Sequence, residues 1–188
     1  MAITKIQSES LNLSDNYDFT GTVTGVGISE IDTWFYTANE AIPSAYANNL
    51  LSNNWSRLNQ NNFFEKTGTG MTESSGTFTF PSTGKYLIIF QATIATRNNV
   101  DIRRTGATIE ATTNNSTYST FSRTLDSAPL IDSAETYSSA SASGILDVTD
   151  TANVKVRFRY FVEATDGQIF GSSTYKETGV DFIKLADT

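Results

Sequence analysis

The chain has few of the side chains that usually carry out chemistry in proteins. It contains no histidine and no cysteine among its 188 residues. Histidine is the commonest general base and metal ligand, and the cysteine thiolate acts as a nucleophile and a zinc ligand. Catalysis would therefore have to rest on carboxylates or on a Ser–Lys pair, and no recognisable motif surrounds either. We predict a protein that is not an enzyme and that binds no cofactor or metal.

Two closely spaced pairs of aspartates remain as candidates for acid chemistry or metal binding. Asp147 and Asp150 share one predicted turn with threonines, but Ca²⁺ takes about six to eight oxygen ligands, which two carboxylates do not supply. We interpret this pair as a polar turn between strands. Asp15 and Asp18 lie where nothing fixes their separation, whereas a glycosidase needs two carboxylates at a defined distance. A polysaccharide depolymerase is therefore the least favoured alternative.

A basic stripe follows one predicted strand near the C-terminus. Lys155, Arg157 and Arg159 alternate with apolar residues, and Arg103 and Arg104 would extend the stripe if their strand lies beside it. We interpret the stripe as a solvated outer face of the protein. A contact with an anion or a glycan is the alternative.

The sequence contains no targeting signal for secretion or for a membrane. Residues 1–10 lack the apolar region of a signal peptide, and no apolar run approaches the length that spans a bilayer. We expect a soluble protein, assembled in a cytoplasm, with no membrane partner. The N-X-Ser/Thr sequons that begin at Asn12, Asn54 and Asn115 are therefore interpreted as accidental.

The net charge of −7 is unevenly distributed along the chain. Residues 1–50 contain one lysine against six acidic residues, while the rest of the sequence is nearly balanced. An acidic N-terminal region repels polyphosphates, so we predict no nucleic-acid partner. The 8 tyrosines, 12 phenylalanines and abundant threonines are typical of β-strands, because β-branched and aromatic side chains fit a pleated surface.

One stretch, Gly76 to Thr96, predicts the centre of the fold. Residues Thr77 to Phe80 alternate polar and apolar, which indicates a short strand with one covered face. Pro81 ends this strand because it has no N–H for the ladder, and Ser82 to Gly84 form a turn. From Tyr86 to Ile94, apolar residues occupy both faces of a long strand, which lies either in the middle of a sandwich or at a subunit interface. One face carries Tyr86, Ile88, Phe90, Ala92 and Ile94, and the other carries Leu87, Ile89 and Ala95.

The region before this core strand is harder to interpret. Trp34 and Phe35 resemble the first strand of a domain. The segment Ser44 to Leu58 has some helical spacing of apolar residues, but its asparagines compete for backbone hydrogen bonds and favour turns. We therefore predict a strand at residues 55–58, and residues 59–64 then supply a turn and a return to the core.

Short strands separated by turns continue to the end of the chain, which favours a sandwich or jelly roll. We predict turns at residues 97–99 and at Thr105-Gly106, and a loop at Gly167 to Ser173. The clearest strand is Val154 to Val162, whose apolar residues alternate with Lys155, Arg157 and Arg159. The predicted strands are residues 100–104, 107–111, 118–125, 138–146, 154–162 and 174–185.

The stretch GTFTFPSTGKYLIIFQ resembles the signature of the C1q/TNF-like jelly roll. In that signature a strand ending in proline precedes a Gly-X-Tyr that opens a long hydrophobic strand, and the residues that match are Phe80, Pro81, Gly84, Tyr86, Ile88 and Phe90. The family has a Phe-X-Gly near its end, for which this chain offers Phe170-Gly171 and Thr178-Gly179. The resemblance covers about residues 33–185. It implies a jelly-roll β-sandwich that forms a tight homotrimer and acts as a binding or capping module.

The N-terminal residues resemble a different kind of segment. ITKIQSESLNLSDNYDFTGTVTGVG is similar to leaders that precede such domains in structural proteins of marine tailed bacteriophages. We therefore divide the chain into an extended attachment segment at residues 1–27, with a Gly/Thr hinge at residues 21–27, and a jelly-roll domain at residues 28–188. A disordered leader without a role is the alternative. The residues expected to contact another virion protein are Ile6, Leu11, Leu13 and Phe19.

Together these observations predict a non-enzymatic structural protein of a phage virion, a trimeric fibre, decoration or appendage. The alternative is a receptor- or glycan-binding adhesin of a tail or head fibre, with a host surface glycan as its partner. One thin sandwich covers only one face of the core strand, so the other face is expected at a three-fold axis, or else beneath loops of a monomer. The candidate residues for core or trimer interface are Tyr86, Leu87, Ile88, Ile89 and Phe90.

Overall fold

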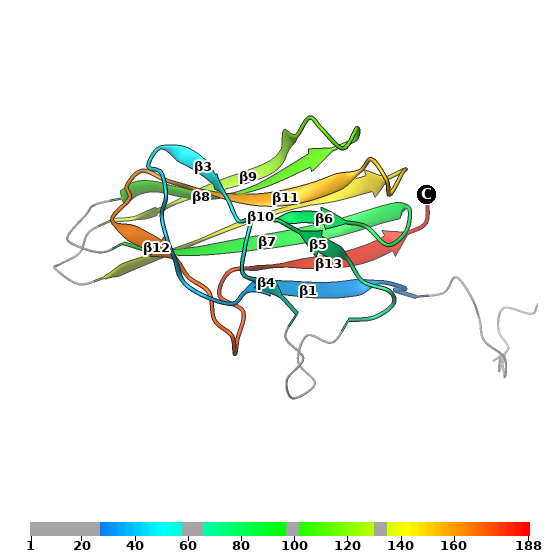
Figure 1. Ribbon diagram of the computed structural model, residues 1–188, viewed down its shortest axis with the longest axis horizontal. Coiled ribbons are helices and arrows are strands. Elements are labelled where there is room, and N and C mark those ends of the chain that lie inside the picture. Colours follow the sequence, from blue (N-terminus) through cyan, green and yellow to red (C-terminus); the bar gives the residue numbers. More distant parts are fainter. Residues whose placement is uncertain (1–26, 58–65, 97–101, 130–134) are drawn as a thin grey trace, which may run out of the picture.

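The computed structural model describes residues 27–57, 66–96, 102–129 and 135–188, and these form a β-sandwich (Figure 1). Within those ranges the chain forms strands and no helix, which confirms the all-β prediction. Consequently the described ranges contain no helix suited to crossing a membrane. The strands are β1 (Ile31–Tyr36), β2 (Glu40–Ala41), β3 (Ala47–Leu50), β4 (Trp55–Ser56), β5 (Thr72–Ser74), β6 (Thr77–Thr79), β7 (Gly84–Thr96), β8 (Ile102–Thr112), β9 (Ser119–Ala128), β10 (Thr136–Val148), β11 (Lys155–Val162), β12 (Gly167–Ile169) and β13 (Gly179–Ala186).

Two antiparallel sheets make up the sandwich. The seven-stranded sheet has the order β2-β12-β7-β13-β1-β4, with β10 on the other edge of β7, and the six-stranded sheet has the order β5-β6-β11-β8-β9, with β3 beside β11. The chain passes between the sheets from β6 to β7, from β7 to β8, from β9 to β10 and from β10 to β11, whereas β8 and β9 pair with each other in the six-stranded sheet. This crossing pattern is that of a jelly roll, which confirms the predicted fold class.

Strand β7 lies in the middle of its sheet, as predicted. It pairs with β10 along its whole length, from Gly84 beside Val148 to Thr96 beside Thr136. Its other edge is shared by β12 and β13. The glycine that opens β7 has φ +142, and a Cβ there would lie 2.6 Å from the carbonyl oxygen of Ala186. Glycine is therefore required at Gly84, where β7 approaches the end of β13.

The inner face of β7 meets an aromatic core. Tyr86, Ile88 and Phe90 are at most 1% exposed, and the ring of Phe90 lies 4.8 Å from that of Phe158 on β11. Phe78 on β6 occupies the centre of this core. Its ring contacts those of Trp34, Trp55, Phe158 and Phe182, with ring centroids 5.3–5.4 Å apart. Mutual edge-to-face and tilted packing of this kind stabilises a core beyond the apolar area it buries.

The outer face of β7 is covered less than the sequence predicted. Leu87 and Ile89 are only half-buried, although Ala95 is fully buried. Gln91 and Thr93 also lie on this face. The prediction that both faces are buried is therefore wrong for the single chain, because the sandwich supplies a partner sheet to one face of β7 only.

One predicted turn is wrong, and one predicted loop begins later than expected. Thr105-Gly106 lies inside β8 rather than between strands. A Cβ at Gly106 would lie 2.7 Å from the carbonyl oxygen of Thr124 on β9, so this glycine permits close strand packing and makes no turn. The predicted loop at Gly167 to Ser173 begins with the short strand β12, and Gly167 itself packs against the Ala95 carbonyl.

The other predicted strands are found with shifted ends. Strand β4 begins at Trp55, as predicted, and no helix forms between Ser44 and Arg57. Strand β13 begins at Gly179, so of the two candidate positions for the Phe-X-Gly, Thr178-Gly179 lies at the start of the last strand. The predictions for residues 1–26, 58–65, 97–101 and 130–134 lie outside the described residues, including those for Ile6, Leu11, Leu13, Phe19, Asn12, Asp15 and Asp18.

Truncating Phe90 to alanine tests the core. Phe90 is fully buried, so the substitution leaves a cavity and should lower the free energy of unfolding by about 3–5 kcal/mol. Denaturant unfolding followed by circular dichroism measures this change. Tyr175, whose side chain is 57% exposed, is the matched control, and Tyr175→Ala should change stability by less than about 0.5 kcal/mol. A loss below about 1 kcal/mol at Phe90 would contradict the structure.

Candidate functional sites on the two outer faces

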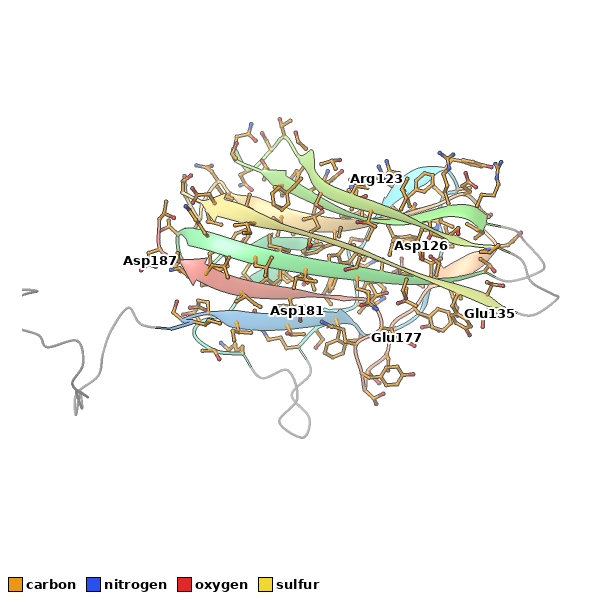
Figure 2. The ribbon with its side chains drawn as sticks, turned by 180° about the vertical axis from the view of Figure 1, so that it is seen from behind. Arg123, Asp126, Glu135, Glu177, Asp181 and Asp187 are labelled. Atoms are coloured by element: carbon orange, nitrogen blue, oxygen red, sulfur yellow. The ribbon has the colours of Figure 1, made fainter. Side chains whose placement is uncertain are left out.

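An apolar row crosses the outer face of the seven-stranded sheet. The strand register places Ile145 of β10 beside Leu87 of β7, Leu87 beside Ile183 of β13, and Ile183 beside Ile31 of β1. We call these four residues the aliphatic row. Figure 2 shows this face, with β10, β7, β13 and β1 side by side. Ile145 is 57% exposed and the other three are half-buried, so the row is a continuous apolar strip open to solvent.

Polar and small residues continue the face beyond the aliphatic row. Ile89 lies between Ser143 of β10 and Asp181 of β13. Asp181 accepts hydrogen bonds from the Thr33 hydroxyl at 2.7 Å and from the Lys176 ammonium at 2.5 Å, and it is labelled in Figure 2. Its charge is compensated within the chain, so this part of the face is polar without carrying an unpaired carboxylate.

The five residues predicted for core or interface fall into two groups. Tyr86, Ile88 and Phe90 belong to the core, where burial raises the pKa of the Tyr86 phenol and its hydroxyl lies 3.0 Å from the hydroxyl of Ser82. Leu87 and Ile89 lie on the outer face. The sequence analysis missed Ile31, Ile145 and Ile183, because only the register between distant strands shows that they extend the row from Leu87.

The Asp147–Asp150 turn is held by its own hydrogen bonds. The Asp150 carboxylate accepts from the backbone N–H of Ala152 at 2.8 Å and from the Asn153 amide at 2.6 Å. These bonds, with the one from Ala152 contributing most, lower the pKa of Asp150. Across the described ranges, no three acidic side chains gather as metal ligands would. Asp150 therefore lies in a polar turn, as predicted, whereas Asp147 lies in β10 beside Lys85, so the prediction that both share one turn is wrong.

The outer face of the six-stranded sheet carries the basic stripe. Arg157 and Arg159 both donate to one Glu110 oxygen, at 2.5 and 2.8 Å. Lys155 donates to the Thr79 hydroxyl at 3.0 Å, and the Arg157 guanidinium stacks on the ring of Tyr118 at 3.9 Å. The stripe therefore lies on an outer face, as predicted, but Glu110 compensates part of its charge.

A second group of basic residues lies on the same sheet, at the end of β11. The guanidinium groups of Arg104 and Arg123 lie 5.8 and 5.2 Å from the centre of the Phe161 ring. Glu163 accepts from Arg104 at 2.6 Å and lies 3.5 Å from Arg103. We call Arg103, Arg104 and Arg123 the arginine cluster. The bond from Arg104 is the main reason that the pKa of Glu163 lies below its usual value of 4.5.

Comparisons with known proteins bear on the fold alone. No family model matches the chain, and a search of curated proteins finds no match. Solved structures of murine APRIL are similar. The structure at pH 5.0 has a TM-score of 0.56 at 13% identity, the one at pH 8.0 has 0.54 at 13%, and the one at pH 8.5 has 0.52 at 14%. Each comparison covers 83% of this chain and 98% of the APRIL chain.

These similarities confirm the TNF-like jelly roll that the core-strand signature predicted. At such identities they establish the fold and no role. The oligomeric state, the bacteriophage origin and the division at residue 27 therefore stay predictions.

Glu163→Gln tests the ion pairs of the arginine cluster. Because the pKa of Glu163 is lower in the folded than in the unfolded chain, its charge stabilises the fold above about pH 4.5. That contribution is lost as the pH falls through the lowered value. We expect the free energy of unfolding at pH 7 to be higher for wild type than for the variant. We expect this difference to shrink below pH 4.5. Denaturant unfolding at several pH values measures it, and a difference independent of pH would contradict this account.

Proposed function

We propose that the chain is a homotrimeric, non-enzymatic structural and binding module of a tailed bacteriophage particle. The aliphatic row is the observation that carries the proposal. A sandwich that has already buried its core gains nothing by displaying four aligned aliphatic side chains, whereas a second copy packed on them removes this area from water. The resemblance to C1q/TNF-like domains implies three copies around an axis, which would place the row of each copy against a neighbour.

The state of the buried carboxylates supports a role without catalysis. Asp32 and Glu163, the two buried acids among the described residues, are both ion-paired. Asp32 accepts from Arg57, from the Trp34 indole and from the backbone N–H of Met71. Asp32 therefore holds β1 against the segments that contain Arg57 and Met71, and its carboxylate lone pairs are already used in these hydrogen bonds. Both buried carboxylates are therefore used in structural ion pairs.

Attachment to the particle is assigned to residues 1–27. Support comes from the phage-like leader sequence and from Gly27, the first described residue. Gly27 has φ +99, and no atom of another residue lies within 4 Å of where its Cβ would be. A glycine in the left-handed region with open space around it permits the segment to leave at several angles. Three linked segments would also bind with avidity.

An adhesin that binds a receptor or glycan is the second candidate function. It is favoured by the arginine cluster, which places exposed cations on the face of the sandwich opposite the aliphatic row. The two functions are compatible, because one face would serve assembly while the other serves binding.

Ile145→Asp tests the trimer. Ile145 is mostly exposed in the single chain, so the charge should leave the monomer folded but oppose burial of the aliphatic row. We expect wild type to sediment as three copies and the variant as one, with unchanged circular dichroism. Leu125→Asp is the matched control, since Leu125 is 49% exposed on the other sheet, and it should remain trimeric. A wild-type monomer at micromolar concentration would refute the proposal.

Deletion of residues 1–24 tests attachment. The described residues begin after this segment, so the shortened chain should keep its fold and its trimer but no longer join the particle. Sedimentation reports the first property and incorporation into assembling virions reports the second. Normal incorporation of the shortened chain would assign attachment to the sandwich instead.

A further inference from the structure

Positive charge gathers on the outer face of the six-stranded sheet. Six of the thirteen lysines and arginines of the chain lie on or beside this face, and they meet two carboxylates, Glu110 and Glu163. The chain as a whole has a net charge of −7. Its positive potential is therefore concentrated on one side of the molecule. The six residues are Arg103, Arg104, Arg123, Lys155, Arg157 and Arg159.

We infer that this face binds an acidic polysaccharide at the arginine cluster. The inference names the ligand class for the binding role proposed above and rests on that role. It requires neither three copies of the chain nor a phage particle.

The strand register alternates cationic and apolar rows at the cluster. Arg159, Thr108 and Arg123 form one row across β11, β8 and β9, and Phe161, Gly106 and Leu125 form the next. Arg104 and Glu163 form the row beyond Phe161 and Gly106. A pyranose ring in an acidic polysaccharide has an apolar C–H face and a carboxylate or sulfate at its rim. The C–H face can pack on exposed Leu125. The guanidinium groups on both sides of the Leu125 row can bind the carboxylate or sulfate with paired hydrogen bonds.

The arginines differ in how much of their charge is available. Arg157 and Arg159 share Glu110, and their side chains are only 24% and 21% exposed. Arg103 and Arg104 share Glu163, yet their side chains are 75% and 56% exposed. Arg123 is exposed and, within the ranges the structure describes, has no carboxylate partner. The cluster thus presents more positive charge than Glu163 can compensate.

A buried hydroxyl in the same row points to a missing partner. Thr108 is 0% exposed, and its Oγ1 is the single buried side-chain N or O atom without a hydrogen bond in the described part of the chain. It lies between Arg159 and Arg123 in the register. Leaving a buried hydroxyl without a partner costs free energy. An anionic oxygen seated between the two arginines would accept its hydrogen bond once the side chains that cover Thr108 move aside.

The arrangement favours a polysaccharide over a nucleic acid. Duplex DNA carries one charge per about 1.7 Å, and proteins bind it through cations that follow an extended groove. Here the three exposed arginines gather around Phe161 and Glu163. A polysaccharide offers both charged groups and apolar ring faces, which match the alternating rows.

The test compares wild type with Arg103→Gln/Arg123→Gln. This double variant removes two exposed charges and keeps the Arg104–Glu163 bond, so the fold should survive. The matched control is Lys66→Gln/Lys85→Gln, which makes the same charge change at two exposed positions elsewhere. The probes are dextran sulfate, hyaluronate, neutral dextran and a short DNA duplex, measured by calorimetry at low and physiological salt.

We expect wild type to bind dextran sulfate, hyaluronate or both, and neutral dextran not at all. The arginine double variant should bind at least about tenfold more weakly, and the lysine control within about twofold of wild type. Equal losses in both variants would overturn the site, since net charge alone would then explain binding. DNA binding as tight as polysaccharide binding would overturn the ligand class, and no binding of either acidic polysaccharide would overturn the inference. Sedimentation of the same samples reports the trimer separately.

Discussion

The whole sandwich depends on strand β7, which is paired on both hydrogen-bonding edges and also packs into the core. Its backbone pairs with β10 on one side and with β12 and β13 on the other, so no hydrogen-bonding edge of this strand is left for another chain. Its inner face completes the aromatic core around Phe78 and Phe158. Only its outer face remains for contacts beyond the chain, and the aliphatic row is centred there.

Charge compensation divides the molecule into two different outer faces. On the seven-stranded sheet, Lys176 compensates the charge of Asp181, which also accepts a hydrogen bond from Thr33, and the apolar strip lies beside this polar area. On the six-stranded sheet, two carboxylates hold four arginines in place, and Arg123 adds its charge. An assembly built through the first face leaves the second open, so one small sandwich can accommodate both proposed contacts.

The sequence predicted what depends on local pattern and missed what depends on register. The apolar run around Phe90 and the break at Phe80-Pro81 were enough to predict β7 and the preceding strand β6, and the core-strand signature then predicted the jelly roll. The aliphatic row was not predicted, because Leu87 and Ile145 meet only through the pairing of β7 with β10. Gly106 was misinterpreted for the same reason: glycine marks both turns and close strand contacts, and only the position of Thr124 distinguishes them. The place of Arg123 in the cluster was not predicted either, because it depends on the pairing of β9 with β8, which no local sequence pattern shows.

The position of β1 has a mechanical consequence for a chain held by its N-terminus. A pull on residues 1–27 is applied directly to β1, which runs antiparallel to β13 from Ile31 beside Ile183 to Phe35 beside Gly179. When the rest of the sandwich resists a pull along β1, the tension loads these ladder bonds in shear, and they share the load. The ion pair of Asp32 with Arg57 adds a further restraint against sliding. If residues 1–27 are the attachment segment proposed above, tension enters the sandwich through an element suited to resist extension.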